Sequence, residues 1–138
     1  MNRVVVTGLG VVSPVGNDVE SFWHALCTGT CGIGPITRFD TTDFKVKIAG
    51  EVRNFDPKQY MDKLDILHSD IYTQFAMAAA CQAMFDSRLA SEIDPERIGV
   101  YIGTGIGGIA TFMAEHQKLL ERGPRRVSPF FIPMMIAN

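Results

Sequence analysis

The chain has 138 residues, of which 46% are hydrophobic and 20% charged, and its net charge is −2. These values suit one soluble globular domain or a piece of a larger one, and they exclude nucleic-acid binding driven by bulk positive charge. No apolar run is long enough for a membrane span. Three cysteines without a CxxC pair argue against a disulfide framework and a structural zinc site, so we expect a reducing compartment.

The N-terminal segment reads as a strand followed by a turn-rich loop. Residues 3–7 form a β-branched run that is closed by glycine, which is typical of a buried strand. No hydrophobic stretch of signal-peptide length precedes it, so we expect a cytoplasmic protein. Residues 8–17 contain three glycines and a proline, which predict tight turns.

A helix should follow, with Asn17 or Asp18 as its cap. Its apolar residues recur at i, i+3, i+4 and i+7: Val19, Phe22, Trp23 and Leu26. Residues 46–52 alternate weakly and indicate an edge strand. Asp56 followed by Pro57 is a typical start of a short helix.

The second half alternates between helix and strand. Residues 69–86 predict a long, alanine-rich helix that we expect to be buried on most sides, because small side chains permit close approach. Residues 98–102 predict a second strand, and residues 109–120 a third helix that Gly123-Pro124 ends. This order of elements indicates an α/β fold. Residues 129–137 are apolar at nine successive positions, so we expect an interior segment severed from its continuation.

A glycine-rich turn lies between the second strand and the third helix. Gly103, Gly105 and Gly108 satisfy G-x-G-x-x-G, the pattern with which dinucleotide-binding folds approach a pyrophosphate. That fingerprint also requires a strand ending in Asp or Glu about twenty residues further on, and this region instead reads as helix and turn. The favoured interpretation is a turn that keeps side chains away from a packed junction or cavity.

Local chemistry alone predicts no reaction. Each cysteine, Cys27, Cys31 and Cys81, is interpreted as structural, because none has the base and lowered pKa that a nucleophile needs. The three histidines, His24, His68 and His116, lack metal-ligand spacing.

Several segments taken together resemble the β-ketoacyl synthases over the whole chain, residues 1–138. The segments that carry the resemblance, in order, are Val4-Val5-Val6-Thr7-Gly8-Leu9-Gly10, Ser13-Pro14-Val15-Gly16, Phe39-Asp40-Thr41, Ala49-Gly50, Gln82-Ala83-Met84, Ile102-Gly103-Thr104-Gly105-Ile106-Gly107-Gly108 and Gly123-Pro124-Arg125-Arg126-Val127-Ser128-Pro129-Phe130-Phe131-Ile132-Pro133. The resemblance implies a thiolase-like fold, layered αβαβα in the complete enzyme, of which this chain is part of the N-terminal half.

The resemblance also implies an activity, and it requires no cofactor. Such enzymes take an acyl chain onto a cysteine, decarboxylate malonyl-carrier protein and join the resulting carbanion to the acyl group, with two histidines stabilising the charge on the thioester oxygen. The implied cysteine and both histidines lie beyond Asn138. We therefore assign no catalytic residue here and expect these 138 residues to be inactive alone.

Binding residues do carry over from the resemblance. Ile106 matches an isoleucine that gates the acyl pocket, with Gly105 and Gly107 giving it an uncrowded backbone. Phe131 matches an aromatic residue that reaches across a homodimer into the partner's acyl pocket.

Arg125 and Arg126 match a basic patch that receives the acidic acyl carrier protein. Family members often place basic residues before the aspartate that opens the long helix. Here Leu67, His68 and Ser69 precede Asp70, so we expect that side of the patch either to be weaker or to be supplied by Lys63.

Fatty-acid elongation is the expected pathway, and three alternatives stay open. One is a polyketide-type ketosynthase or an inactive chain-length factor. The second is a non-catalytic module, against which the apolar residues 130–137 argue, because such a patch invites aggregation or a partner. The third is a nucleotide-binding oxidoreductase domain.

Overall fold

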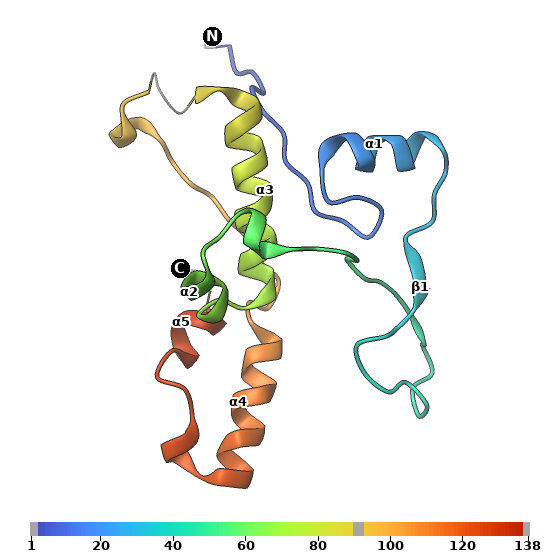
Figure 1. Cartoon of the computed structure of the whole chain (residues 1–138), viewed down its shortest axis with the longest axis vertical. Helices are drawn as coiled ribbons and strands as arrows, with labels where there is room; N and C mark the ends of the chain where they lie inside the picture. The colour runs from blue at the N-terminus through green and yellow to red at the C-terminus, as the bar shows by residue number, and fades with distance from the viewer. Residues whose placement is uncertain (1–2, 90–92, 137–138) are drawn as a thin grey trace. The chain divides into compact units, whose positions relative to one another are not determined.

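The computed structural model describes residues 3–89 and 93–136, which form two compact units (Figure 1). Unit 1 contains residues 3–56 and 79–89, and unit 2 contains residues 57–78 and 93–136. The long helix α3 (Ile71–Ser87) contributes to both units, and each unit is described by itself.

Unit 1 contains one short helix and one two-stranded sheet. Helix α1 (Val19–Cys27) begins where it was predicted, with the Asp18 carboxylate accepting the Ser21 N–H at 2.8 Å. This hydrogen bond is the main reason that the pKa of Asp18 lies below its ordinary value. Strands β1 (Ile33–Pro35) and β2 (Ile48–Gly50) pair antiparallel, so the strand predicted within residues 46–52 is confirmed.

Unit 2 is built from helical segments. In chain order they are η1 (Pro57–Gln59), α2 (Lys63–Leu67), the first part of α3, η3 (Pro95–Arg97), α4 (Ile109–Arg122), η4 (Pro124–Arg126) and α5 (Phe131–Met135). The predicted helix start at Pro57 and the predicted stop at Gly123 are confirmed, and Gly123 has φ 78°, which glycine adopts without strain. Both η4 and α5 pack against α4 (Figure 1).

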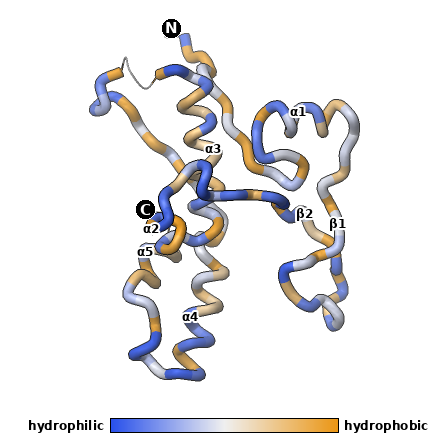
Figure 2. Tube along the Cα trace, in the orientation of Figure 1, coloured by the Kyte–Doolittle hydropathy of each residue, from blue (hydrophilic) through white to orange (hydrophobic). Residues whose placement is uncertain are grey.

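Two segments that were predicted to be strands do not form strands in the structure. Residues 3–7 and 98–102 are not paired as strands in the described structure, and their apolar side chains are exposed, with Val4 at 92% and Val100 at 77%. Figure 2 shows that apolar stretches lie on extended segments as well as on helices. A β-branched run favours a buried strand. A strand also needs a neighbouring strand that forms hydrogen bonds with its backbone N–H and C=O groups.

Helix α3 is slim, and the glycine-rich segment of unit 1 lies directly against it. A Cβ atom on Gly10 would come within 1.9 Å of the Ala79 carbonyl oxygen, and one on Gly8 within 2.2 Å of the Ala83 oxygen. Only glycine permits this approach. The expectation that α3 is buried on most sides is wrong, because only Gln74 and Ala78 of its residues are buried. The alanines allow close approach along one strip, and the other faces of α3 remain accessible.

Polar side chains of α3 hold the same segment through its backbone. The Leu9 N–H donates to the Asp86 carboxylate at 3.0 Å. Gln82 accepts the Val11 N–H at 3.1 Å and donates its amide to the Asn17 carbonyl at 2.7 Å. These bonds replace the sheet ladder that residues 8–12 would otherwise need, so the segment is fixed without being a strand.

Substituting Gly10 should destabilise the protein measurably. In Gly10→Ala the added methyl group overlaps the Ala79 carbonyl, and overpacking of this kind costs about 1–3 kcal/mol. The matched control is Gly99→Ala, where a Cβ atom meets nothing within 4 Å. Thermal unfolding followed by circular dichroism should show a clearly lower Tm for Gly10→Ala only. Equal Tm values for the two variants would contradict the close approach.

Candidate functional site

The glycine-rich loop of residues 103–108 is anchored at its C-terminal end. Gly107 has φ 75°, and a Cβ atom there would lie 2.3 Å from the Met135 carbonyl oxygen. The Gly108 N–H donates to that same oxygen at 2.7 Å, and the Thr104 hydroxyl accepts the Gly107 N–H at 3.1 Å. Glycine is therefore required at 107 for both its backbone angle and its surroundings.

The other end of the loop is open. A Cβ atom on Gly103 or Gly105 would meet nothing within 4 Å. Between the open and anchored ends, the Ile106 side chain is 74% exposed. The loop thus presents Ile106 on a backbone that is free on one side and fixed on the other.

Phe131 opens the short helix α5, whose last carbonyl belongs to Met135. Its ring centroid lies 6.2 Å from that of Phe112 on α4. Phe112 also stacks on His116 at 6.1 Å, so this histidine has an aromatic neighbour on its own helix. The segments that carry Ile106 and Phe131 are therefore joined through Met135 and through the packing of α5 on α4.

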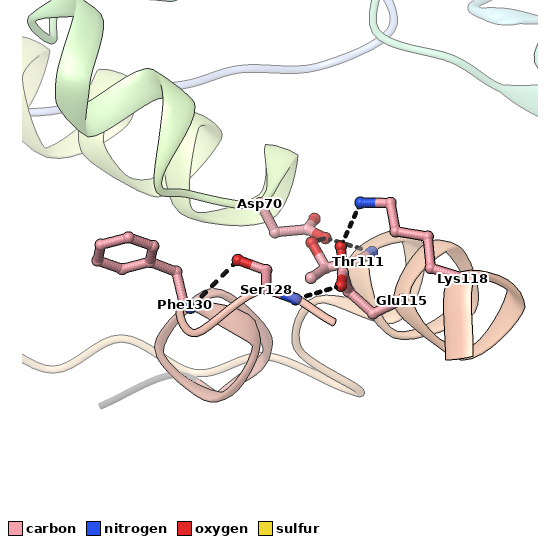
Figure 3. Close-up of polar contacts among 6 residues, drawn as sticks. All are labelled: Asp70, Thr111, Glu115, Lys118, Ser128 and Phe130. Atoms are coloured by element: carbon pink, nitrogen blue, oxygen red, sulfur yellow. Dashed lines mark hydrogen bonds and ion pairs between the residues drawn. The ribbon is translucent and has the colours of Figure 1, made fainter. Parts of the chain in front are cut away.

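Asp70 is a site residue that the sequence did not reveal as one. It is 6% exposed, and its Oδ2 atom accepts both the Thr111 N–H at 2.9 Å and the Thr111 hydroxyl at 2.6 Å (Figure 3). Thr111 lies in the first turn of α4, where backbone N–H groups lack partners within the helix. A carboxylate is the favoured group at this positive end of a helix.

Glu115 is a second buried carboxylate on α4, and it ties the chain that follows η4 back to the helix. Its Oε1 atom pairs with the Lys118 ammonium at 2.5 Å, and its Oε2 atom accepts the Ser128 N–H at 2.7 Å (Figure 3). Two hydrogen bonds hold the pKa of Glu115 below its ordinary value. The bond with Lys118 has the larger effect and the bond from the Ser128 N–H the smaller one. No local pattern in the sequence signals this role, because the polar residues His116, Gln117 and Lys118 follow Glu115 directly.

The predicted docking cations are exposed and lie on two elements. Arg125 and Arg126 form η4, immediately before the segment that Glu115 holds. Lys63 is the first residue of α2, which the Asp62 carboxylate caps. The ring of His68 stacks on Phe130 at 4.0 Å, which links the end of α2 to the residue preceding α5.

Unit 2 also has an open cavity of about 560 Å³ with mainly apolar walls. It is lined by Tyr72, Thr73, Ala76, Met77, Val100, Tyr101, Ile102, Pro133 and Ile136. None of the four predicted substrate-binding residues lines it. The cavity instead lies beside the exposed segment 98–102.

The cysteines and histidines form no reactive cluster in the described parts of the chain. Cys27 and Cys31 are exposed, Cys81 is half-buried, and all three are free thiols. Within residues 3–89 and 93–136, no group of three potential metal ligands comes together. Across those same residues, no helix is both long and apolar enough to cross a membrane.

Comparison with known sequences identifies relatives over the whole length. Residues 1–138 match the family model of the beta-ketoacyl synthase N-terminal domain. The chain is 53% identical over 137 residues to 3-oxoacyl-[acyl-carrier-protein] synthase 2 of Vibrio cholerae, and 48% identical to the enzyme of that name from Staphylococcus aureus. Each match covers 99% of this chain and 33% of the relative, so the chain spans about a third of their length.

Solved structures agree with the sequence matches. The ishigamide ketosynthase/chain length factor matches 96% of this chain with a TM-score of 0.78 and 29% identity, over 34% of its own chain. A type II polyketide ketosynthase in complex with its acyl-carrier protein matches 96% with a TM-score of 0.77 and 25% identity, over 36% of its own chain. The predicted thiolase-like α/β fold is confirmed, and the chain belongs to the beta-ketoacyl synthase family, matching its N-terminal domain.

Proposed function

We propose that these residues are the N-terminal third of a 3-oxoacyl-[acyl-carrier-protein] synthase that elongates fatty acyl chains. The observation that carries this proposal is the 53% identity over 137 residues to a relative of that name. The ishigamide ketosynthase/chain length factor shares the fold at 29% identity, and a type II polyketide ketosynthase shares it at 25% identity. A polyketide-type ketosynthase or chain-length factor is therefore the second candidate.

The proposed reaction is a decarboxylative condensation. A cysteine thiolate takes the acyl group from its carrier, malonyl-carrier protein loses CO₂, and the resulting carbanion attacks the thioester carbonyl. A carbon–carbon bond forms, and the thiolate leaves. The nucleophilic cysteine and the two histidines that stabilise the oxyanion lie outside residues 1–138 in this proposal. The present residues then contribute pocket, dimer and docking surfaces.

The acyl pocket is the proposed role of the loop around Ile106 and of Phe131. The open surroundings of Gly105 leave room for the Ile106 side chain to swing, while Gly107 holds the loop against Met135. Phe131 would line the acyl pocket of the partner subunit in a homodimer. Within one subunit, α5 joins the segments that carry Ile106 and Phe131.

Carrier-protein docking is the proposed role of Arg125, Arg126 and Lys63. The two arginines are exposed, and the bond from Glu115 to Ser128 fixes the backbone just after them. Exposed cations accelerate encounter with an acidic partner through complementary charge. One solved relative is a ketosynthase bound to its acyl-carrier protein.

The arrangement at the start of α4 disfavours nucleotide binding. A pyrophosphate would need the free N–H groups of this helix end. Gly108 instead donates to the Met135 carbonyl, and Thr111 donates to the Asp70 carboxylate. A phosphate placed there would meet a buried negative charge. Of the three glycines in the G-x-G-x-x-G pattern, Gly108 serves close backbone packing, whereas Gly103 and Gly105 have open surroundings.

The proposal predicts condensation by the complete protein that contains this chain. Incubated with acyl- and malonyl-carrier protein, it should form 3-oxoacyl-carrier protein and CO₂, which mass spectrometry detects. A ligand that binds only the folded state raises the Tm. Because we propose that the protein does not bind nucleotides, saturating NAD or NADP should leave its Tm unchanged. Absence of condensation together with a Tm rise on nucleotide would favour the oxidoreductase alternative.

Reversing the charge of Arg125 and Arg126 should impair docking selectively. The double variant Arg125→Glu/Arg126→Glu is expected to raise the KM for malonyl-carrier protein by about tenfold at low salt, with kcat little changed. The control is Arg97→Glu, an exposed arginine on η3 outside the proposed patch. A KM increase of equal size in the control would show a general charge effect and refute the assignment.

Glu115 should confer an acid-sensitive part of the stability. Because its pKa is lowered in the folded protein, the Glu115 contribution is present above its ordinary pKa of 4.5 and is lost as pH falls through the lowered value. Glu115→Gln should therefore lower Tm at pH 7, and the Tm difference should shrink as pH falls below 4.5. Glu121→Gln, an exposed carboxylate on the same helix, is the control. A pH-independent Tm difference would contradict this role.

A further inference from the structure

We infer that Asp70 is a positioning residue for the loop that carries Ile106. Its buried carboxylate fixes the N-terminal turn of α4 and, through it, the anchored end of the loop of residues 103–108. The assignment of this loop to the acyl pocket rests on the proposed function. The mechanical link itself rests only on contacts within unit 2.

The first step is the attachment of Asp70 to α4. Asp70 precedes the first residue of α3 and lies 41 residues before Thr111 in sequence, yet it accepts both hydrogen bonds that Thr111 can donate (Figure 3). Charge-assisted bonds of this kind are stronger than neutral ones, and burial at 6% exposure shields them from competing water. The start of α4 is therefore fixed from outside its own helix.

The second step is the junction at Gly107 and Gly108. A Cβ atom on Gly108 would lie 2.5 Å from the Met134 carbonyl oxygen and 3.0 Å from the Asp70 Oδ2 atom. The Gly108 N–H is bonded to the Met135 carbonyl, one of the groups that a helix C-terminus leaves without an internal partner. Asp70, the loop and the end of α5 therefore meet around two glycines.

The two ends of the loop differ in their freedom to move. Gly103 and Gly105 have open surroundings, whereas Gly107 and Gly108 are enclosed by backbone and by Asp70. A swing of Ile106 must therefore pivot on the side of residues 103–105. Because Phe131 lies on α5, which shares the junction through Met135, the anchor also sets the position of Phe131 relative to Ile106.

Loss of the Asp70 carboxylate should release the anchored half of the loop. In the complete protein, Asp70→Ala is expected to speed hydrogen exchange of residues 103–110 by about tenfold or more, while exchange in α1 stays unchanged. The ratio of kcat/KM for long over short acyl-carrier substrates should change severalfold. Both effects follow because the pocket wall is no longer held in one position.

A graded series keeps the test decisive if Asp70→Ala folds poorly. Thr111→Val removes the 2.6 Å hydroxyl bond and keeps the backbone N–H bond, so it should give a smaller change of the same kind. Thr111→Ser should behave like the unaltered protein. Asp62→Asn, which preserves a capping side chain on α2, is the matched acidic control.

Unchanged exchange at residues 103–110 in both Asp70→Ala and Thr111→Val would overturn the inference, whatever happens to the Tm. Faster exchange without a change in chain-length preference would also overturn it, because the anchor would then not act on the acyl pocket. If the unaltered complete protein fails to condense substrates, the proposed function fails. The exchange data would still decide whether Asp70 holds the loop.

Discussion

The backbone of this chain runs against its own helices at distances that leave no space for a side chain. In unit 1, Gly8 and Gly10 lie on the carbonyls of α3, and in unit 2, Gly107 and Gly108 lie on the last carbonyls of α5. Each contact brings polar main-chain groups close together, and such groups need hydrogen-bond partners. Gln82 supplies them in unit 1, and in unit 2 the Gly108 N–H itself does so.

Two buried carboxylates, Asp70 and Glu115, hold segments of unit 2 together through hydrogen bonds. Asp70 accepts the Thr111 N–H at the positive end of α4. Glu115, which lies one helical turn after Thr111, accepts the N–H of Ser128 in the segment after η4. Both acids act on main-chain N–H groups far away in sequence, so they define where loops lie rather than which helices form. The predicted pocket residues and the two arginines lie on segments next to these contacts, whereas Lys63 lies on α2, which Asp62 caps. A binding function gains precision from such attachment, because a side chain is only as well placed as its backbone.

Local signals in the sequence predicted local structure well. The Asp18 cap, the proline at 57 and the glycine at 123 each marked a helix boundary that the structure contains. Residues 3–7 and 98–102 were wrongly predicted as strands, because pairing depends on a neighbour that no local pattern specifies. The bond from Asp70 to Thr111 was equally invisible, since it joins positions 41 residues apart. The sequence does not distinguish Gly105 from Gly107, yet only Gly107 packs against the Met135 carbonyl. The roles of Ile106, Phe131 and the docking cations stay predictions from the family.

The most direct test of the account is to locate the acyl-enzyme bond. The complete protein and the 138-residue chain would each be incubated with acyl-carrier protein and digested, and the modified peptide would be identified by mass spectrometry. The account predicts an acyl group on one cysteine outside residues 1–138 of the complete protein, and none on the 138-residue chain. An acyl thioester on Cys27, Cys31 or Cys81 would contradict it, because it would place the nucleophile within these residues.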